Sequence, residues 1–86
     1  MGSYEVRLTN SAEKELWNLP ASTVAVLWPG IRALAREPRS RQAKKLKGAE
    51  RAYRLRVRDY RVIYTIDDDL KLVVIAAIRH RKEAYR

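Results

Sequence analysis

The sequence contains no cysteine, one histidine, three glycines and three prolines. The lack of cysteine excludes a disulfide framework and a thiolate zinc site, and one histidine excludes a multi-histidine metal centre. The longest apolar run, Leu72 to Ile78, is too short to cross a membrane, which takes about 20 residues. The N-terminus lacks the basic and apolar segments of a secretory signal. We therefore expect a cytoplasmic protein without a metal, a cofactor or a membrane partner.

The chain length bounds the architecture. Eighty-six residues suffice for one domain, and we expect residues 1–86 to form it. The apolar share of 47% supports a packed core and argues against disorder.

Positive charge dominates and is concentrated in one part of the chain. The 19 lysines and arginines outnumber the 10 acidic residues, giving a net charge of +9. Residues 1–38 have no net charge, so the whole excess falls in residues 39–86. Such crowding is unfavourable unless a polyanion binds there, and nucleic acid is the commonest one. The alternatives are a solvated basic surface and an acidic protein partner.

The first half of the chain predicts a strand and a helical hairpin. Residues 4–8 alternate apolar and charged side chains, as a half-buried strand does. Residues 9–11 offer helix caps, Glu13 stands at capping-box spacing from Asn10, and the helix ends before Pro20. The side chains that we expect to face inward are Ala12, Leu16, Trp17 and Leu19.

A second helix is predicted to start at Ser22 or Thr23 and to end at Glu37-Pro38. Pro29-Gly30 lies inside it. Because proline removes a backbone donor and clashes with the preceding turn, we expect a kinked helix or two short ones.

Residues 39–51 are predicted to form a basic loop, in which Leu46 is the expected anchor. After this loop, apolar side chains recur at every second residue, which is the period of a β-strand. Turns are predicted at Asp59 and at residues 67–69. The strands that they separate are residues 53–58, 61–66 and 70–79. The predicted fold class is α+β: an N-terminal strand, a helical hairpin and a three-stranded antiparallel meander, with the helices on one face of a single sheet.

Strand periodicity places arginines on the open face of the sheet. If the apolar side chains of residues 53–57 face the helices, the arginines between them face away. The predicted cluster is Arg54, Arg56, Arg61, Arg79 and Arg81. A phosphodiester would offset the mutual repulsion of these groups through bidentate hydrogen bonds. The alternative is that such arginines only solvate the sheet, and we assign Arg58 to that role.

The sequence has no glycine-rich phosphate loop, no carboxylate cluster for a divalent metal and no Ser, His and Asp in the order of a catalytic triad. Any phosphoryl chemistry is then expected to be metal-free, with the RNA 2′-hydroxyl attacking its own phosphate. Arginines stabilise charge but are not ordinary bases, because their pKa lies above about 12. The candidates for acid and base are His80, Tyr85, a lysine and Glu50. The alternatives are that His80 simply ends a strand and that Tyr85 is a frayed terminal residue.

Four segments, taken together, resemble the RelE/ParE toxin superfamily, and most closely its RelE branch. They are Lys45-Leu46-Lys47-Gly48, Tyr53-Arg54-Leu55-Arg56-Val57, Asp59-Tyr60-Arg61-Val62-Ile63-Tyr64 and His80-Arg81-x-x-x-Tyr85. The resemblance covers nearly the whole chain, including the leading strand and the helical hairpin.

The resemblance implies a type II toxin that is silenced by a cognate antitoxin protein and meets DNA only through that antitoxin. It implies a metal-independent endoribonuclease that enters the ribosome and cuts the A-site codon. By position, Arg61 and Arg79 would contact phosphate, Tyr85 would contact substrate, and Arg54 and Arg56 stand where lysines are common. The residues implied to face ribosomal RNA are Arg39, Arg41, Lys44, Lys45, Lys47 and Arg51.

Two features depart from the family pattern. Arginine at 54 and 56 cannot accept the 2′-hydroxyl proton as a lysine can, so Tyr85, His80, Glu50 or water must take it, or the reaction is slow and depends on alignment. Pro29-Gly30 interrupts a helix expected to be smooth. Two other functions stay open: a ParE-like inhibitor of DNA gyrase, and a nucleic-acid-binding module or relic without activity.

Overall fold

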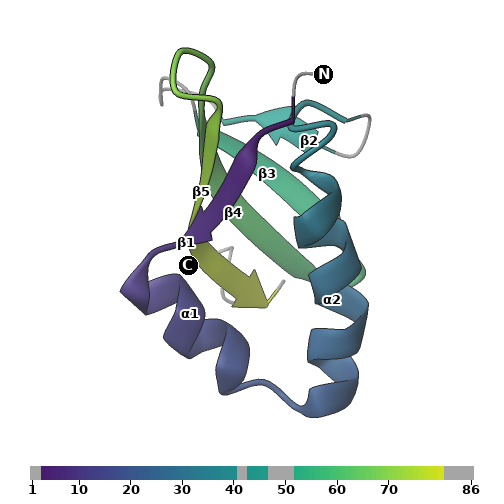
Figure 1. Cartoon of the computed structure of the whole chain (residues 1–86). Helices are drawn as coiled ribbons and strands as arrows, with labels where there is room; N and C mark the ends of the chain where they lie inside the picture. Colours follow the sequence, from purple (N-terminus) through teal and green to yellow (C-terminus); the bar gives the residue numbers. More distant parts are fainter. Residues whose placement is uncertain (1–2, 41–42, 47–51, 81–86) are drawn as a thin grey trace.

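The computed structural model describes residues 3–40, 43–46 and 52–80. The elements in chain order are β1 (Glu5–Leu8), α1 (Asn10–Trp17), α2 (Ala21–Ala33), β2 (Ala43–Lys45), β3 (Ala52–Val57), β4 (Tyr60–Asp67) and β5 (Leu72–His80). Figure 1 shows the two helices joined by a short link and lying against one sheet. The predicted α+β class and helical hairpin are therefore confirmed.

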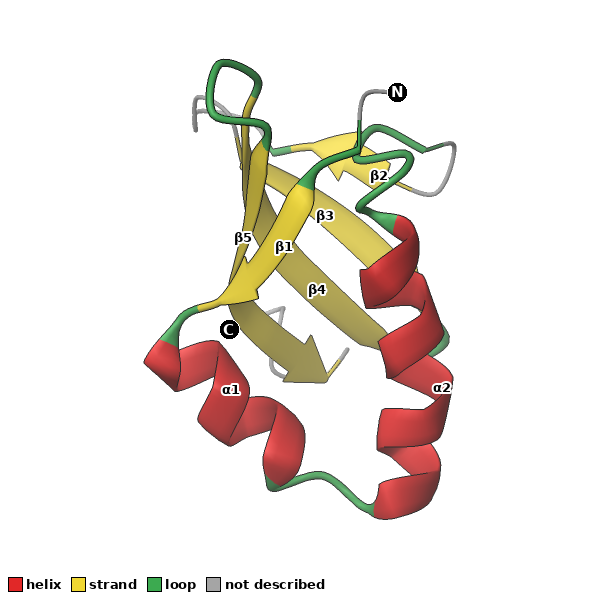
Figure 2. Ribbon diagram, in the orientation of Figure 1, coloured by secondary structure: helices red, strands yellow, loops and turns green. Residues whose placement is uncertain are grey.

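The sheet has five strands in the order β1-β5-β4-β3-β2. β1 runs parallel to β5, and the other neighbouring strands are antiparallel. Figure 2 shows β1 beside β5, with β2 beyond β3 at the opposite edge. β2 lies inside the stretch predicted as a loop, so that prediction was wrong for Ala43–Lys45. This three-residue basic segment has no strand periodicity of its own, and it is extended because its backbone pairs with β3.

α1 is capped by Thr9, not by Asn10. The Thr9 hydroxyl accepts a hydrogen bond from the Ala12 N–H at 3.1 Å, so the predicted capping box is wrong. Leu16 and Ala12 are buried one helical turn apart, as predicted. Trp17 is 60% exposed instead of buried, because it lies a quarter-turn around the helix from Leu16, and its ring packs against Trp28.

α2 is one helix that continues through Pro29, so the alternative of two short helices was wrong. It begins after Pro20 without a side-chain cap, rather than at Ser22 or Thr23. It ends at Ala33, before the predicted end at Glu37-Pro38. A Cβ on Gly30 would lie 3.2 Å from Val57 Cγ2, so glycine lets α2 pack closely on β3. Within the described residues, no helix is long and apolar enough to cross a membrane.

The core lies between the helices and one face of the sheet. Its buried residues are Ala12, Leu16, Leu27, Ile31, Leu34, Leu55, Val62, Tyr64, Ile66, Val73, Ile75 and Ile78. Tyr64 is the largest of them, and its hydroxyl donates to the Pro38 carbonyl at 2.6 Å. Burial raises the pKa of Tyr64 to about 12. Because one sheet face is filled in this way, polar residues of alternate parity are left on the other.

The turn between β4 and β5 is longer than predicted. The Leu70 N–H donates to Asp67 Oδ1 at 3.0 Å, which confirms the acidic turn. Leu70 was expected to begin the last strand, but it is 70% exposed and belongs to the turn. Lys71 follows with a positive φ of 53°, so the strand starts only at Leu72.

Candidate functional site

Three arginines form a row across the open face of the sheet. Arg56 on β3 stands directly opposite Arg61 on β4, and Arg61 stands directly opposite Arg79 on β5. Directly opposed residues of antiparallel strands share a face, with Cβ atoms about 4.5–5.5 Å apart. The neighbouring residues Leu55, Val62 and Ile78 are buried against the helices, so the row faces away from them. The structure thus brings together Arg56, Arg61 and Arg79, as the sequence predicted.

A β-bulge in β5 decides where Arg79 points. Tyr64 pairs with Ile75 but Ile63 pairs with Ala77, so Ala76 is the extra residue. With a regular register, Arg61 would stand opposite Ile78, and Arg79 would face the helices. The bulge reverses the parity of the rest of the strand and places Arg79 in the row. The sequence contains no signal for this, because β5 is apolar on both faces before the bulge.

Thr9, at the start of α1, forms hydrogen bonds with the backbone of this bulge. Its backbone N–H donates to the Ile75 carbonyl at 2.9 Å, and its hydroxyl is 3.3 Å from the Ala76 carbonyl, to which it donates. The same hydroxyl caps α1 by accepting from the Ala12 N–H. One side chain therefore serves both the helix and the strand that carries Arg79.

Glu15 on α1 forms an ion pair with Arg79. Its other oxygen, Oε1, accepts a hydrogen bond from the backbone N–H of Ile78 at 3.0 Å. Sequence reasoning missed Glu15, because 64 residues separate it from Arg79 and nothing in the local pattern links them.

Two more cations lie on the open face, beside the row of three arginines. Arg54 on β3 pairs with Lys44 on β2 and with Ile63 on β4, so Lys44 and Arg54 share the face of the arginine row. Arg54 is half-buried and Lys44 is exposed. We call the set the arginine face: Lys44, Arg54, Arg56, Arg61 and Arg79. Lys45 pairs with Tyr53 and has the opposite parity, so it lies outside this set.

Arg39, predicted to face ribosomal RNA, is held by other side chains of the protein. Its guanidinium donates to both carboxylate oxygens of Asp68, at 3.1 and 2.8 Å, and to the Tyr53 hydroxyl at 3.1 Å. Tyr4 donates to the same Asp68 carboxylate at 2.6 Å. The hydrogen bonds from Arg39 and then from Tyr4 lower the pKa of Asp68 to about 2, and the pair raises the pKa of Arg39.

The remaining predicted site residues fall elsewhere. His80 stands opposite Tyr60 in a row that faces the helices, and its ring meets the Tyr60 ring edge-on, with centroids 5.1 Å apart. It is therefore not on the arginine face. Arg58 is exposed in the β3–β4 turn at a φ of 53°, which fits the solvating role assigned to it. The predicted residues Arg41, Lys47, Glu50, Arg51, Arg81 and Tyr85 lie outside the described residues.

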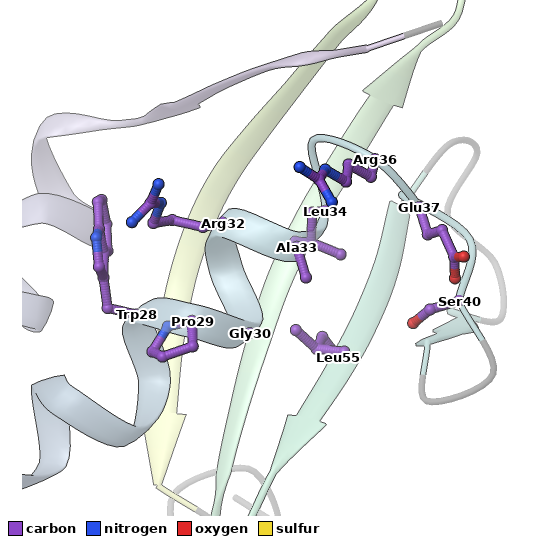
Figure 3. Close-up of a pocket in the computed structure, with 10 residues that line it drawn as sticks. All are labelled: Trp28, Pro29, Gly30, Arg32, Ala33, Leu34, Arg36, Glu37, Ser40 and Leu55. Atoms are coloured by element: carbon purple, nitrogen blue, oxygen red, sulfur yellow. The ribbon is translucent and has the colours of Figure 1, made fainter. Parts of the chain in front are cut away.

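The helix side of the molecule carries a hollow of about 590 Å³ beside the second half of α2. Figure 3 shows that it extends from Trp28 and Pro29 on the helix to Ser40 beyond it, with Leu55 of β3 facing the helix. Leu34 and Leu55 are buried beneath this site, whereas Arg32 near the end of α2 and Arg36 in the turn that follows the helix are exposed. The hollow thus combines an apolar lining with two positive charges and the single negative charge of Glu37.

The fold and the arginine face define a class of small α+β protein whose one helix-covered sheet leaves a basic face open. Residues 6–85 match the family described as the ParE toxin of the type II toxin–antitoxin system parDE. The chain belongs to this family, within the RelE/ParE toxins.

Relatives and solved structures support this assignment. Toxin RelG of Mycobacterium tuberculosis is 36% identical over 85 residues, spanning 96% of this chain and 97% of that protein. The toxin–antitoxin complex RelBE2 of M. tuberculosis contains a chain with a TM-score of 0.81 and 35% identity, with 92% of both chains covered. The archaeal RelE–RelB complex of Pyrococcus horikoshii has a TM-score of 0.81 and 30% identity, with 92% of this chain and 96% of that chain covered.

Proposed function

We propose that this protein is a type II toxin that cleaves mRNA in the ribosomal A site without a metal ion. The observation that carries the proposal is the row of Arg56, Arg61 and Arg79 on the open sheet face. Guanidinium groups bind phosphate oxygens through paired N–H donors, and they stay charged at any physiological pH. The similarity to proteins named RelE and RelG supports the same function.

The proposed reaction is attack by a 2′-hydroxyl on the adjacent phosphorus. The new bond joins the 2′-oxygen to phosphorus, and the bond from phosphorus to the 5′-oxygen breaks. Arg61 and Arg79 stabilise the extra negative charge that develops on the phosphate, and Arg54 and Arg56 hold the RNA backbone in line. The 2′-hydroxyl loses its proton, and the leaving 5′-oxygen gains one. Because His80 lies on the other face of the sheet, we assign this proton transfer to Tyr85, Glu50 or water.

The proposal places ribosomal RNA along the basic segment between α2 and β3. Lys44, which belongs to the arginine face, and Lys45 are both exposed on the edge strand β2. We propose that they bind phosphates together with Arg41, Lys47 and Arg51. Arg39 joins them only if RNA displaces Asp68 from its guanidinium. A ribosomal target implies that the protein acts in the cytoplasm.

The test uses purified protein, programmed ribosomes with a defined A-site codon and the same mRNA without ribosomes. Primer extension maps the cleaved ends. We expect a cut within the A-site codon only when ribosomes are present. We expect Arg61→Ala and Arg79→Ala to remain folded, to abolish growth inhibition and to slow this cut strongly, to a residual rate that single-turnover measurements still detect. Arg7→Ala is the matched control, because it removes an exposed arginine from the edge strand β1. Full toxicity of both site variants would show that the site is assigned wrongly.

Gyrase inhibition is the second candidate, because the matching family is described as a ParE toxin. A folded protein that leaves A-site codons intact but blocks supercoiling by purified gyrase would replace the first proposal. If neither activity is found, the protein is a binding module without catalysis.

We further propose that a cognate antitoxin segment binds the hollow beside α2. The similar M. tuberculosis and P. horikoshii structures are both toxin–antitoxin complexes. An amphipathic segment fits the hollow, since its apolar side chains can pack on the accessible Trp28, Pro29 and Ala33 while acidic side chains meet Arg32 and Arg36.

The test for this docking surface reverses its charge. Arg32→Glu with Arg36→Glu should weaken antitoxin binding at least tenfold, because two attractions become repulsions. Arg7→Glu with Lys14→Glu is the matched control, because both residues are exposed and lie outside the hollow. Equal affinity of the two double variants would place the antitoxin elsewhere.

A further inference from the structure

Glu15 covers the edge of β5 beyond the end of β1. β1 pairs with β5 only as far as Ile75, so another group must satisfy the backbone N–H groups that follow on this edge. α1 lies along this edge, and the carboxylate of Glu15 accepts the Ile78 N–H at 3.0 Å. Glu15 is therefore anchored to the strand backbone, one residue before Arg79.

The anchored carboxylate also binds the Arg79 side chain. Oε1 takes the Ile78 N–H, and Oε2 forms the ion pair with Arg79 Nη1. In the described part of the chain, the side-chain hydrogen bonds of Arg79 all involve Nη1, including a long one of 3.5 Å to the Ile78 carbonyl. Nε and Nη2 form the other edge of the planar group, which is the pair of donors that binds a phosphate in bidentate fashion.

The arginine row makes this anchoring necessary. Arg79 stands directly opposite Arg61, and like charges in that position repel. A long arginine side chain without a partner would move among many rotamers and turn away from its neighbour. The Glu15 and Arg79 side chains are only 32% and 40% exposed, so solvent screens their attraction less than it would on an open surface.

We propose that Glu15 is a positioning residue for Arg79. It holds the guanidinium at the end of the arginine row by one edge and leaves the opposite edge to an RNA phosphate. Both carboxylate oxygens already accept hydrogen bonds, which favours a holding role over that of a proton acceptor. The inference rests on the proposed RNA-cleaving function, but the placement of Arg79 can be measured separately.

The first experiment measures Arg79 itself by the NMR signal and order parameter of its Nε–H group. In the wild type we expect a distinct signal with restricted motion. In Glu15→Ala we expect the signal to move to the averaged position of a solvated arginine. Glu13→Ala is the matched control, because it removes an exposed carboxylate from the same helix, and it should leave the signal unchanged. An Arg79 signal that is equally ordered in Glu15→Ala overturns the proposal, whether or not the protein cuts RNA.

The second experiment measures single-turnover cleavage on programmed ribosomes, well below the unfolding temperature of each variant. Glu15→Ala should slow cleavage about 10- to 100-fold, since a small misplacement of a catalytic group has that effect, while the affinity for ribosomes stays within about threefold. Glu15→Gln should cleave at a rate between those of the wild type and Glu15→Ala, because it keeps one acceptor oxygen. Glu15→Ala with Arg79→Ala should be no slower than Arg79→Ala alone.

Two results would overturn the positioning role: wild-type cleavage by Glu15→Ala, or a double variant slower than Arg79→Ala by the full effect of Glu15→Ala. A pH–rate profile whose acidic limb disappears in Glu15→Gln would instead identify Glu15 as the base. If the wild type does not cut A-site codons at all, the proposed function fails while the NMR experiment still decides how Arg79 is held.

Discussion

At the scale of single residues, the arginines at 54 and 56 limit the chemistry of the arginine face. Each is fully charged and cannot accept a proton near neutral pH. A lysine at either position would have its pKa lowered by the neighbouring guanidiniums and could act as a base. The face as it stands favours phosphate binding and charge stabilisation over proton transfer.

We therefore predict that Arg56→Lys makes ribosome-dependent cleavage faster, by about tenfold or more, because general base catalysis contributes about 10²–10⁴-fold when it is well placed. The rate should rise with pH up to the pKa of the new lysine. Single-turnover cleavage between pH 6 and 9 measures this. Arg58→Lys, in the adjoining turn, is the control and should have no such effect. A slower Arg56→Lys enzyme would mean that bidentate contact matters more than proton transfer at this position.

A second prediction at this scale concerns Asp68. Its pKa is about 2 in the folded chain against an ordinary value of 3.8, so its contribution to stability is present above pH 4. That contribution is lost as the pH falls from about 4 to 2, because the unfolded chain then binds a proton more readily than the folded chain. Asp68→Asn should flatten the decline in unfolding midpoint over this range. Asp69→Asn, the control from the same turn, should not, and identical acid profiles for the two variants would show that the Arg39–Asp68 pair adds little.

At the scale of elements, the contact between α1 and β5 organises the candidate site. Thr9 binds the bulge, and Glu15 binds the edge strand and Arg79. Helix α1 thus does more than cover the core, since its N-cap contacts the bulge of β5 and its Glu15 contacts the last arginine in the row.

We predict that Thr9→Ala lowers the free energy of unfolding by about 1 kcal/mol, the usual effect of losing an N-cap. For a domain of this size the melting temperature should fall by roughly 4–8 °C per kcal/mol. Thr9→Ser keeps the hydroxyl and should restore most of the loss, whereas Thr23→Ala, which caps no helix, is the control. Thermal unfolding followed by circular dichroism measures all three. An equal loss in Thr9→Ser and Thr9→Ala would assign the effect to the methyl group and not to the cap.

At the scale of the whole molecule, charge and topology act together. The sheet separates an apolar face, which the helices cover, from a face with six described cations, namely the five of the arginine face and Arg7 on β1. Phosphate binding at such a face releases counterions, so affinity for RNA depends steeply on salt.

We predict a linear fall of log affinity with log salt concentration for ribosomes and for single-stranded RNA. Each phosphate contact to single-stranded RNA contributes a slope of about −0.7, so Arg61→Ala should make the slope shallower by about that amount. Lys14→Ala removes an exposed charge of α1 that does not belong to the arginine face, and it should leave the slope unchanged. Fluorescence anisotropy from 50 to 300 mM salt gives these slopes. A flat response of the wild type would argue against RNA docking through this face.

Composition and periodicity were enough to predict the α+β class, the helical hairpin, the period-two strands and the arginines that alternate with core residues. These features are local, because they follow from spacings of two and of three or four residues along the chain. Arg56 and Arg61 were placed correctly because a two-residue turn fixes their pairing.

The tertiary structure alone decided the rest. β2 exists because β3 offers it a partner, α2 continues through Pro29 as one helix, and His80 faces the helices because a bulge at Ala76 changes the parity of β5. The ion pair between Glu15 and Arg79 joins residues far apart in sequence. The sequence by itself therefore determined which residues are charged and most of those that are buried, with Trp17 as an exception. Only the folded chain determined which charged groups meet, because pairing register and long-range contacts depend on packing between elements and not on any local pattern.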